Sequence, residues 1–311
     1  MSRSCSIKQR IGAAHNLTTL VHTLVQGSLK PIERYFWNIC TFPLKSCQRT
    51  CHRDGNMREW QRYGLLALMG PVLWLQGVYV RKVTKRLPEP PGERCGIAGT
   101  GPQLCVLIVG DSAAAGVGSD SQEEALSGRL VEHLAQHYTV TWMLTAESGL
   151  DSNGMLDLLA NTAADKFDVV VMSIGVNDVT GLMSPSKWLG LQSQLATEIK
   201  KRFEPAILIH SAVPPMERFT ALPQPLRWFM GSWAREMNRL LKQSLHDSPN
   251  RLLYFPFLHR LPGGLASDGF HPGPLAYAVW GQGLSREIVG RLGNLPRSGQ
   301  TTASKKTTAT G

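Results

Sequence analysis

Cysteine is scarce in this sequence, and most of it lies outside the part of the chain that carries recognisable chemistry. The 311 residues include six cysteines, and only Cys105 lies well inside residues 103–293. A domain of about 190 residues can bury a substantial core, so we expect its stability not to depend on disulfides. A lone buried thiol is compatible with either side of a membrane, and cysteine usage therefore leaves the compartment open.

Motifs for nucleotides and metals are also missing. The glycines after the first apolar run lack the Gly-x-Gly-x-x-Gly spacing of dinucleotide-binding turns, and no phosphate loop with Gly-Lys-Ser/Thr occurs. Cys40, Cys47 and Cys51 with His52 form a grouping that could suggest a metal site, but their spacing matches no zinc pattern. We therefore expect no cofactor and no metal.

The C-terminal part of the chain has almost no net charge, although the whole chain carries +10. Residues 1–86 contain 14 Lys or Arg against 3 Asp or Glu, whereas residues 87–311 contain 19 against 20. A basic nucleic-acid footprint on the globular part is therefore excluded, and we expect no nucleic-acid partner. The basic residues of the N-terminal part flank an apolar segment, which is typical of contact with a membrane.

That apolar segment, residues 63–80, has 18 residues and no charge. As a helix it would span about 27 Å, slightly less than a hydrocarbon core of ~30 Å. Pro71 and Gln76 weaken it further. Three interpretations stay open: a single membrane-spanning anchor, a helix lying in the plane of the membrane or partly inserted, and a buried helix of the globular domain. The first two make membrane lipid a partner of this segment and its basic flanks.

Basic residues on the two sides of the segment bear on its orientation. Arg58 and Arg62 precede it, and four Lys or Arg follow it within 81–86. The positive-inside rule therefore weakly favours a cytoplasmic globular domain. No small-x-small cleavage site follows the segment, which argues against a removed signal peptide.

These features divide the chain into five parts. They are a basic, poorly ordered leader, an apolar anchor helix, a proline-rich linker, a globular domain and a disordered polar tail, at residues 1–62, 63–80, 81–102, 103–293 and 294–311. Charged residues and the apolar run follow Met57 in the order of an anchor, so one hypothesis makes Met57 the true start. Mass analysis of the natural N-terminus decides it, and a peptide from residues 1–56 would contradict it.

The globular part alternates predicted strands and helices. Strands are expected near residues 104, 139, 168, 206 and 251. Helical patterns are expected over residues 121–137, 153–163, 185–203, 226–247 and 274–293. This rhythm predicts a three-layer α/β/α fold with a five-stranded parallel sheet.

Ser112 and His271 are the candidate nucleophile and base. Ser112 follows a β-branched apolar run that ends at Val109, so its hydroxyl should emerge at the carboxyl end of a strand, where ligands of such sheets bind. A serine hydroxyl needs a base to accept its proton, and Asp268, three residues before His271, can orient that imidazole. Any single histidine among the nine is more often structural; the pairing with Asp268 makes His271 a candidate.

Asn177 and Gly149 are candidates for stabilising a negative oxygen. Each follows a predicted strand, so an amide side chain and a close backbone N–H would point into the same crevice as Ser112. With the Ser112 N–H they would form a three-donor oxyanion hole. The structural alternatives are a helix cap or turn for Asn177 and a turn glycine for Gly149.

These segments, in this order, resemble the GDSL or SGNH family of serine esterases and lipases. The motifs are Gly-Asp-Ser at 110–112, the glycine at 149, Gly-x-Asn-Asp at 175–178 and Asp-x-x-His-Pro at 268–272, and the resemblance covers about 103–293. It implies the flavodoxin-like fold of that family, with Ser112 as nucleophile, His271 as base and Asp268 as its orienter. It also implies that Gly149 and Asn177 are oxyanion donors. Ala113 stands where the family usually has leucine or isoleucine.

Longer strings around the same motifs look like a narrower bacterial branch, the FeeA/FeeB-like group associated with long-chain acyl compounds. They are residues 110–118, 175–180 and 222–226. This resemblance implies an apolar acyl substrate and a bacterial inner-membrane location. The segment 213–230 is proline-rich and apolar, which fits a wall over an acyl pocket or a loop packed on the core.

The expected function is hydrolysis of esters or thioesters of medium- or long-chain acyl groups through an acyl-serine. The same residues could serve a carbohydrate O-deacetylase of the cell envelope or an acyltransferase. A non-catalytic membrane adaptor is the alternative from another class of protein. Preference for acetyl or for longer chains separates the first two.

Overall fold

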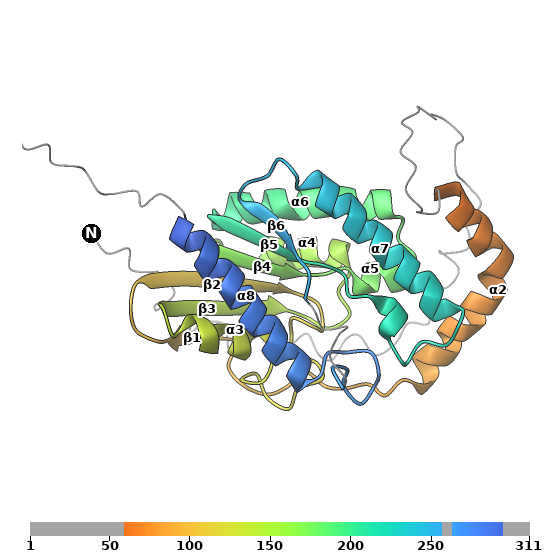
Figure 1. Cartoon of the computed structure of the whole chain (residues 1–311), viewed down its shortest axis with the longest axis horizontal. Helices are drawn as coiled ribbons and strands as arrows, with labels where there is room; N and C mark the ends of the chain where they lie inside the picture. Colours follow the sequence, from red (N-terminus) through yellow and green to blue (C-terminus); the bar gives the residue numbers. More distant parts are fainter. Residues whose placement is uncertain (1–58, 257–262, 295–311) are drawn as a thin grey trace, which may run out of the picture. The chain divides into compact units, whose positions relative to one another are not determined.

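The structure is a computed structural model that describes residues 59–256 and 263–294 (Figure 1). The predictions for the leader before Glu59, including the Met57 start and the cysteine grouping, lie outside the described residues, as does the tail after Asn294. The chain divides into two compact units, residues 1–72 and 73–311, with the boundary inside helix α2 (Glu59–Val83). In the first unit, the described residues 59–72 form the N-terminal part of that helix.

The second unit contains a six-stranded sheet of order β1-β3-β2-β4-β5-β6. Its strands are β1 (Cys95–Ala98), β2 (Gln103–Gly110), β3 (Thr139–Ala146), β4 (Val169–Ser173), β5 (Ile207–Ser211) and β6 (Arg251–Tyr254). Strands β2 to β6 are parallel to their neighbours, and their order is the 2-1-3-4-5 order of flavodoxin-like sheets. β1 pairs antiparallel with β3 at the edge.

The prediction of a purely parallel five-stranded sheet was therefore wrong by one strand. β1 lies within residues 81–102, the segment predicted to be a linker, and its four residues are flanked by Pro and Gly. So short a segment has no measurable alternation, and its pairing depends on β3 more than 40 residues later. The sheet is mixed, with the antiparallel strand at one edge.

The helices of the second unit agree closely with the predicted ranges. They are α3 (Leu126–Leu134), α4 (Ser152–Asn161), α5 (Val176–Thr180), α6 (Pro185–Phe203), α7 (Leu226–Ser244), α8 (Pro274–Asn294) and the short 3-10 helix η3 (Met216–Arg218). The bounds of α6 match the prediction because Ser184 caps it, Pro185 is its first residue and Glu204 ends it in a left-handed conformation. α3 is shorter than predicted, and α5 was not predicted.

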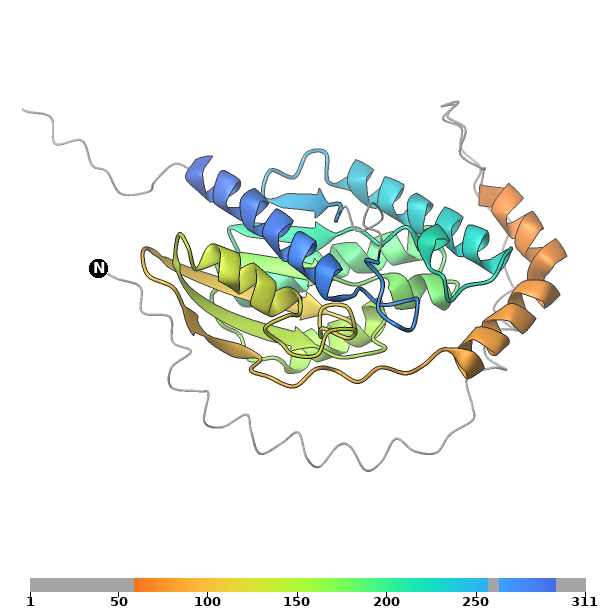
Figure 2. The same cartoon turned by 60° about the horizontal axis from the view of Figure 1, so that its bottom comes forward.

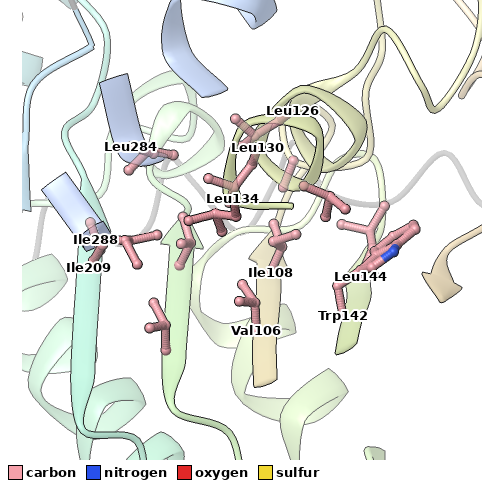
Figure 3. Packing of buried hydrophobic residues seen from close by; sticks show 14 of the residues in the cluster. Val106, Ile108, Leu126, Leu130, Leu134, Trp142, Leu144, Ile209, Leu284 and Ile288 are labelled. Carbon is pink, nitrogen blue, oxygen red and sulfur yellow. The ribbon is translucent and has the colours of Figure 1, made fainter. Parts of the chain in front are cut away.

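Helices α3 and α8 lie side by side on one face of the sheet (Figures 1 and 2). Figure 3 shows their leucines and isoleucines packed on side chains of β2, β3 and β5. The strand residues Val106 and Ile108 are fully buried there, as are Leu130 and Leu284 from the two helices. Leu107 and Val109 alternate with them toward the other face, which α4, α6 and α7 cover, and they too are fully buried. The sheet is thus covered on both faces, as the continuous apolar strands predict.

The predicted apolar helix over 63–80 lies within α2. In the second unit, Leu73 and Val80 of this helix are buried, and the Gln76 amide makes two hydrogen bonds to the start of α7. Gln76 Nε2 donates to the carbonyl of Gln224 at 2.6 Å, and Gln76 Oε1 accepts from the N–H of Leu226 at 3.0 Å. The polar residue that weakens the apolar segment thus has a hydrogen-bond partner for both its amide nitrogen and its amide oxygen. In the parts of the chain that the structure describes, none of the helices has the length and apolar character needed to cross a membrane.

The segment after α2 is attached to the globular domain at several points. Gln122 donates its backbone N–H to the carbonyl of Pro91 at 2.9 Å. The Glu89 carboxylate accepts from the backbone N–H of Ser148 at 2.9 Å and from its hydroxyl at 2.7 Å, and it pairs with Arg94 at 2.9 Å. Residues 89–98 therefore belong to the domain by contact.

Candidate active site

The turn that carries Ser112 begins where β2 ends. Gly110 is paired with Ser173 of β4 on one side and with Ala146 of β3 on the other. A Cβ at Gly110 would lie 2.1 Å from the carbonyl oxygen of Ser173, so only glycine allows the two strands to approach this closely. The chain then turns, and the N–H of Val117 donates to the carbonyl of Ser112 at 3.0 Å. Ser112 is left half-buried at the carboxyl edge of the sheet.

Ser112, His271 and Asp268 lie in a hydrogen-bonded row. His271 Nε2 is 2.9 Å from Ser112 Oγ, and His271 Nδ1 is 2.6 Å from Asp268 Oδ2. A carboxylate beside Nδ1 favours the tautomer with its proton there, which leaves the Nε2 lone pair facing the serine hydroxyl. The side chain of Asp268 is fully buried, whereas that of His271 is 20% exposed. The structure thus brings together the three residues predicted from widely separated segments.

The Asp268 carboxylate is held by its own loop. Its Oδ1 accepts from the backbone N–H groups of Phe270 at 2.9 Å and His271 at 3.0 Å. Burial by itself raises the pKa of Asp268, but the hydrogen bonds from the His271 ring and from these two N–H groups outweigh it and hold the pKa below its ordinary value. Asp268 is therefore ionised at neutral pH.

Asp111, the residue before Ser112, is a second buried carboxyl group at this end of the sheet. It is 2% exposed, and its Oδ1 accepts from the N–H of Ala113 at 3.1 Å. Burial raises the pKa of Asp111 to about 7, against smaller opposing effects from that hydrogen bond and from His271. Sequence reasoning assigned no role to this residue, whose side chain belongs to the wall of the cavity described below.

Asn177 and Gly149 leave the sheet on the two sides of Ser112, after β4 and β3. Asn177 lies in α5, and its Nδ2 donates to the carbonyl of Leu150 at 2.8 Å. Gly149 has φ of +87°, and no heavy atom lies within 4 Å of the place a Cβ would take. The structure therefore joins the two predicted oxyanion segments to each other. Within the described residues, no hydrogen bond joins either one to Ser112, and neither lines the cavity beside it.

A buried network supports these two segments, and sequence reasoning missed it. Asp178, 1% exposed, accepts from the backbone N–H of Ser152 at 3.0 Å and from its hydroxyl at 2.9 Å. Gln192 of α6 donates to the same hydroxyl at 3.1 Å. Burial raises the pKa of Asp178. The signal in the sequence is Asp151, which caps α4 by accepting from the backbone N–H groups of Asn153 and Gly154 and so marks Ser152 as a helix start.

A cavity of about 450 Å³ opens beside Ser112 and His271, within the range of small-molecule pockets. Most of its wall is apolar. Residues 213–215 and 218–220 supply part of it, from the proline-rich segment predicted to cover a pocket, while residues 226–230 of that segment belong to α7 instead. Further apolar side chains around the cavity are Ile174, Val176, Leu265, Phe270 and Trp280. The described residues contain no cluster of three potential metal ligands.

The sheet order and the row of Ser112, His271 and Asp268 define the class of serine hydrolases on a flavodoxin-like sheet. The family model for the GDSL-like lipase/acylhydrolase family matches residues 108–279, more than half of the chain. The chain belongs to this family and is a carboxylic ester hydrolase. No curated protein matches it.

Several solved structures are similar to this chain at low identity. A lipase from a goat rumen metagenome is 18% identical with a TM-score of 0.45, over 59% of this chain and 96% of that one. A member of the lipolytic G-D-S-L family from Veillonella parvula is 13% identical with a TM-score of 0.47, over 60% and 98%. A carbohydrate acetylesterase from Sinorhizobium meliloti is 16% identical with a TM-score of 0.45, over 60% and 99%.

Proposed function

We propose that the protein cleaves esters or thioesters of medium- to long-chain acyl groups through an acyl-serine intermediate. The observation that carries the mechanism is the 2.9 Å separation of His271 Nε2 and Ser112 Oγ, with His271 Nδ1 2.6 Å from Asp268. His271 takes the serine proton as Oγ attacks the acyl carbonyl, and it returns the proton to the leaving alcohol or thiol as that bond breaks. It then deprotonates a water that attacks the acyl-serine, which releases the carboxylic acid and restores Ser112.

The negative oxygen of each tetrahedral intermediate accepts hydrogen bonds in this proposal from the N–H groups of Ser112 and Gly149 and from Asn177 Nδ2. The support is positional, because the strands before Gly149 and Asn177 both pair with the residue at which β2 ends. Asn177 Nδ2 has two hydrogens, and the carbonyl of Leu150 accepts from this nitrogen at 2.8 Å. The second hydrogen is available to an oxyanion.

The apolar wall of the cavity supports an acyl chain as the substrate group bound there. Burial of each methylene contributes about 0.8 kcal/mol, so affinity should rise with chain length until the cavity is full. An acetyl group gains little from such a wall. Transfer to an acceptor other than water would use the same acyl-serine.

Hydrolysis of p-nitrophenyl esters from acetyl to palmitoyl by the full-length protein, beside Ser112→Ala, tests this function. We expect kcat/KM to rise with chain length and turnover to fall by at least ~10⁴-fold in the variant. A preference for acetyl would instead favour carbohydrate deacetylation. Undiminished turnover in the variant would overturn the assignment of Ser112.

We also propose that residues 73–83 of α2 lie in the plane of an anionic membrane surface, the inner membrane in a bacterial cell. Three large side chains of this part of the helix, Leu75, Tyr79 and Val83, are each more than half exposed and recur every four residues on one side. Gln76 pairs with the globular domain on another side. Four basic residues at the end of α2 and just after it are exposed and attract anionic lipid; they are Arg81, Lys82, Lys85 and Arg86.

Sedimentation of the full-length protein with vesicles of phosphatidylcholine and phosphatidylglycerol tests this placement. The double variant Leu75→Ser, Tyr79→Ser should lose at least tenfold in affinity, because two buried apolar side chains contribute more than ~1.4 kcal/mol. The matched control Leu182→Ser, Leu275→Ser removes two other exposed leucines of the domain. Equal binding by both double variants would contradict the placement.

A further inference from the structure

The cavity beside Ser112 has an always-charged side chain that the proposed chemistry does not use. Its lining includes three ionisable residues, Asp111, Arg218 and His271. His271 is the base and Asp111 neighbours the nucleophile. Arg218 comes from η3, and most of its neighbours in the cavity lining from the same segment are apolar, namely Val213, Pro214, Pro215 and Phe219. An arginine in an apolar wall calls for an explanation, because a guanidinium is always charged and brings five N–H donors.

The guanidinium of Arg218 has no hydrogen bond or ion pair within residues 59–256 and 263–294. The carboxylate of its neighbour Glu217 does not neutralise it: Oε1 pairs with Arg235 at 2.6 Å, and Oε2 is buried without a hydrogen-bond partner among the described residues. The other arginine of this region, Arg227, donates from Nε to the carbonyl of Leu222 at 2.6 Å. Arg218 is exposed while lining the cavity, which places a free positive charge at the cavity mouth. Thr220 is also exposed and also lines the cavity, and its hydroxyl is a further hydrogen-bond donor there.

The backbone of Arg218 is fixed relative to the base. Met216 and Phe219, on either side of it, are buried. The Phe219 ring packs on the Phe270 ring at 4.8 Å between centroids, and Phe270 packs on the His271 ring at 5.3 Å. The next turn of chain is joined to the same loop, since the N–H of Ala221 donates to the carbonyl of Gly269. The position of Arg218 is therefore set by contacts that also set His271.

We propose that Arg218 binds an anionic group of the substrate, a carboxylate or a phosphate, so that the preferred substrates are anionic acyl esters or thioesters. This rests on the proposed function. A guanidinium presents paired N–H donors that match carboxylate and phosphate oxygens, whereas an uncharged ester leaves that charge without a partner. The anion can sit on the far end of the acyl chain or on the leaving group.

Two matched substrate pairs distinguish these sources. The first pair is p-nitrophenyl hexanoate and the mono-p-nitrophenyl ester of adipate, which differ by a carboxylate on the acyl chain. The second is hexanoyl pantetheine and hexanoyl 4′-phosphopantetheine, which differ by a phosphate on the leaving group. We expect the full-length protein to favour the anionic member of one pair by about tenfold in kcat/KM.

Arg218→Gln should reduce that preference about tenfold, Arg218→Lys should retain part of it, and the preference of the wild type should fall with added salt. Lys201→Gln, which removes an exposed charge at the end of α6, is the matched control and should retain the full preference. A wild type that favours neither anion, or an Arg218→Gln variant that keeps the preference, would overturn the proposal.

Binding measured without turnover separates this proposal from the proposed function. Octyl phosphate and octanoate are titrated into Ser112→Ala and into Ser112→Ala, Arg218→Gln by calorimetry. About tenfold weaker binding of at least one anion by the double variant supports the anion site even if no ester is hydrolysed. Equal binding by the two proteins rejects it even if esters are hydrolysed.

Discussion

The two halves of the candidate site differ in how completely they are assembled. On the nucleophile side, Ser112, His271 and Asp268 are in direct hydrogen-bond contact and two of them line the cavity. On the oxyanion side, Asn177 and Gly149 are outside the cavity lining and are linked through the Asn177 contact to Leu150. The nucleophile side is thus assembled where the turn after β2 meets the loop of residues 268–271, whereas placement of the candidate oxyanion donors depends on α4, α5 and α6 together.

The two halves also differ in what their buried carboxylate contacts. Asp268 touches the base directly, and hydrogen bonds to it hold its pKa low. Asp178 acts at a distance from the chemistry, on the hydroxyl and N–H of Ser152 at the start of α4. Variants on the first side should therefore affect proton transfer, and variants on the second side should affect the geometry around the oxyanion.

Asp268→Asn should give the largest effect, a loss of about 10³ to 10⁴-fold in kcat, because an amide beside Nδ1 favours the wrong tautomer of His271. The Asn oxygen can still accept from the N–H groups of Phe270 and His271, so the loop should keep its shape. Steady-state kinetics with a p-nitrophenyl ester measures the loss, and circular dichroism checks the fold. A loss below tenfold in a folded variant would show that the contact does not orient the base.

Asn177→Ala should raise the barrier by about 2 to 4 kcal/mol, seen in kcat with little change in KM, if its amide stabilises the oxyanion. The same variant loses the hydrogen bond to the carbonyl of Leu150, so circular dichroism and urea unfolding of Asn177→Ala check that the fold around α5 is kept. A loss below tenfold for Asn177→Ala would remove this residue from the oxyanion role.

Asp111→Asn should change how stability depends on pH. The pKa of Asp111 in the folded protein is raised to about 7 from 3.8, so the protonated form stabilises the fold, and this contribution is lost as the pH rises from about 4 through 7. The stability of the wild type relative to the variant should fall by up to ~1.4 kcal/mol per pH unit in that window. Urea unfolding of both proteins at pH 5, 6, 7 and 8 measures the difference, and parallel curves would refute the raised pKa.

Ser152→Ala should give the smallest effect, about fivefold in kcat, since it removes the hydroxyl that donates to Asp178 and accepts from Gln192, at a net cost of ~1 kcal/mol to the network. KM should be unaffected, because Ser152 does not line the cavity. Ser193→Ala on α6 removes a hydroxyl that bonds only its own helix and serves as the control. Equal kcat in the two variants would mean that the network does not position the oxyanion donors.

The contact of Ser112, His271 and Asp268 could be predicted from the sequence, whereas the contact of Asn177 with Leu150 could not, for a physical reason. Ser112 and His271 follow from local patterns, a β-branched run that ends in a tight turn and a carboxylate three residues before the histidine. The orientation of the Asn177 amide depends on a carbonyl 27 residues earlier in the chain. No local pattern encodes such a contact.

The fold shows the same division between local and distant causes. The limits of α6 follow from its cap, its first proline and its apolar spacing. The edge strand β1 is four residues long and depends on pairing with β3, so it was missed. In the same way, Gln76 interrupts the apolar pattern of residues 63–80, and its hydrogen bonds to Gln224 and Leu226 cannot be read from that pattern because both partners lie about 150 residues away.

The hydrogen bonds that the Glu89 carboxylate accepts from Ser148 limit how far the end of α2 can lie from this part of the domain. Six residues, Thr84 to Glu89, separate the end of α2 from that carboxylate. Fully extended, they reach about 20 Å. A movement of the end of α2 beyond this distance from Ser148 requires either that the hydrogen bonds of Glu89 break or that Ser148, the residue before Gly149, moves as well. As long as these bonds hold, the position of α2 and the conformation at Gly149 depend on each other.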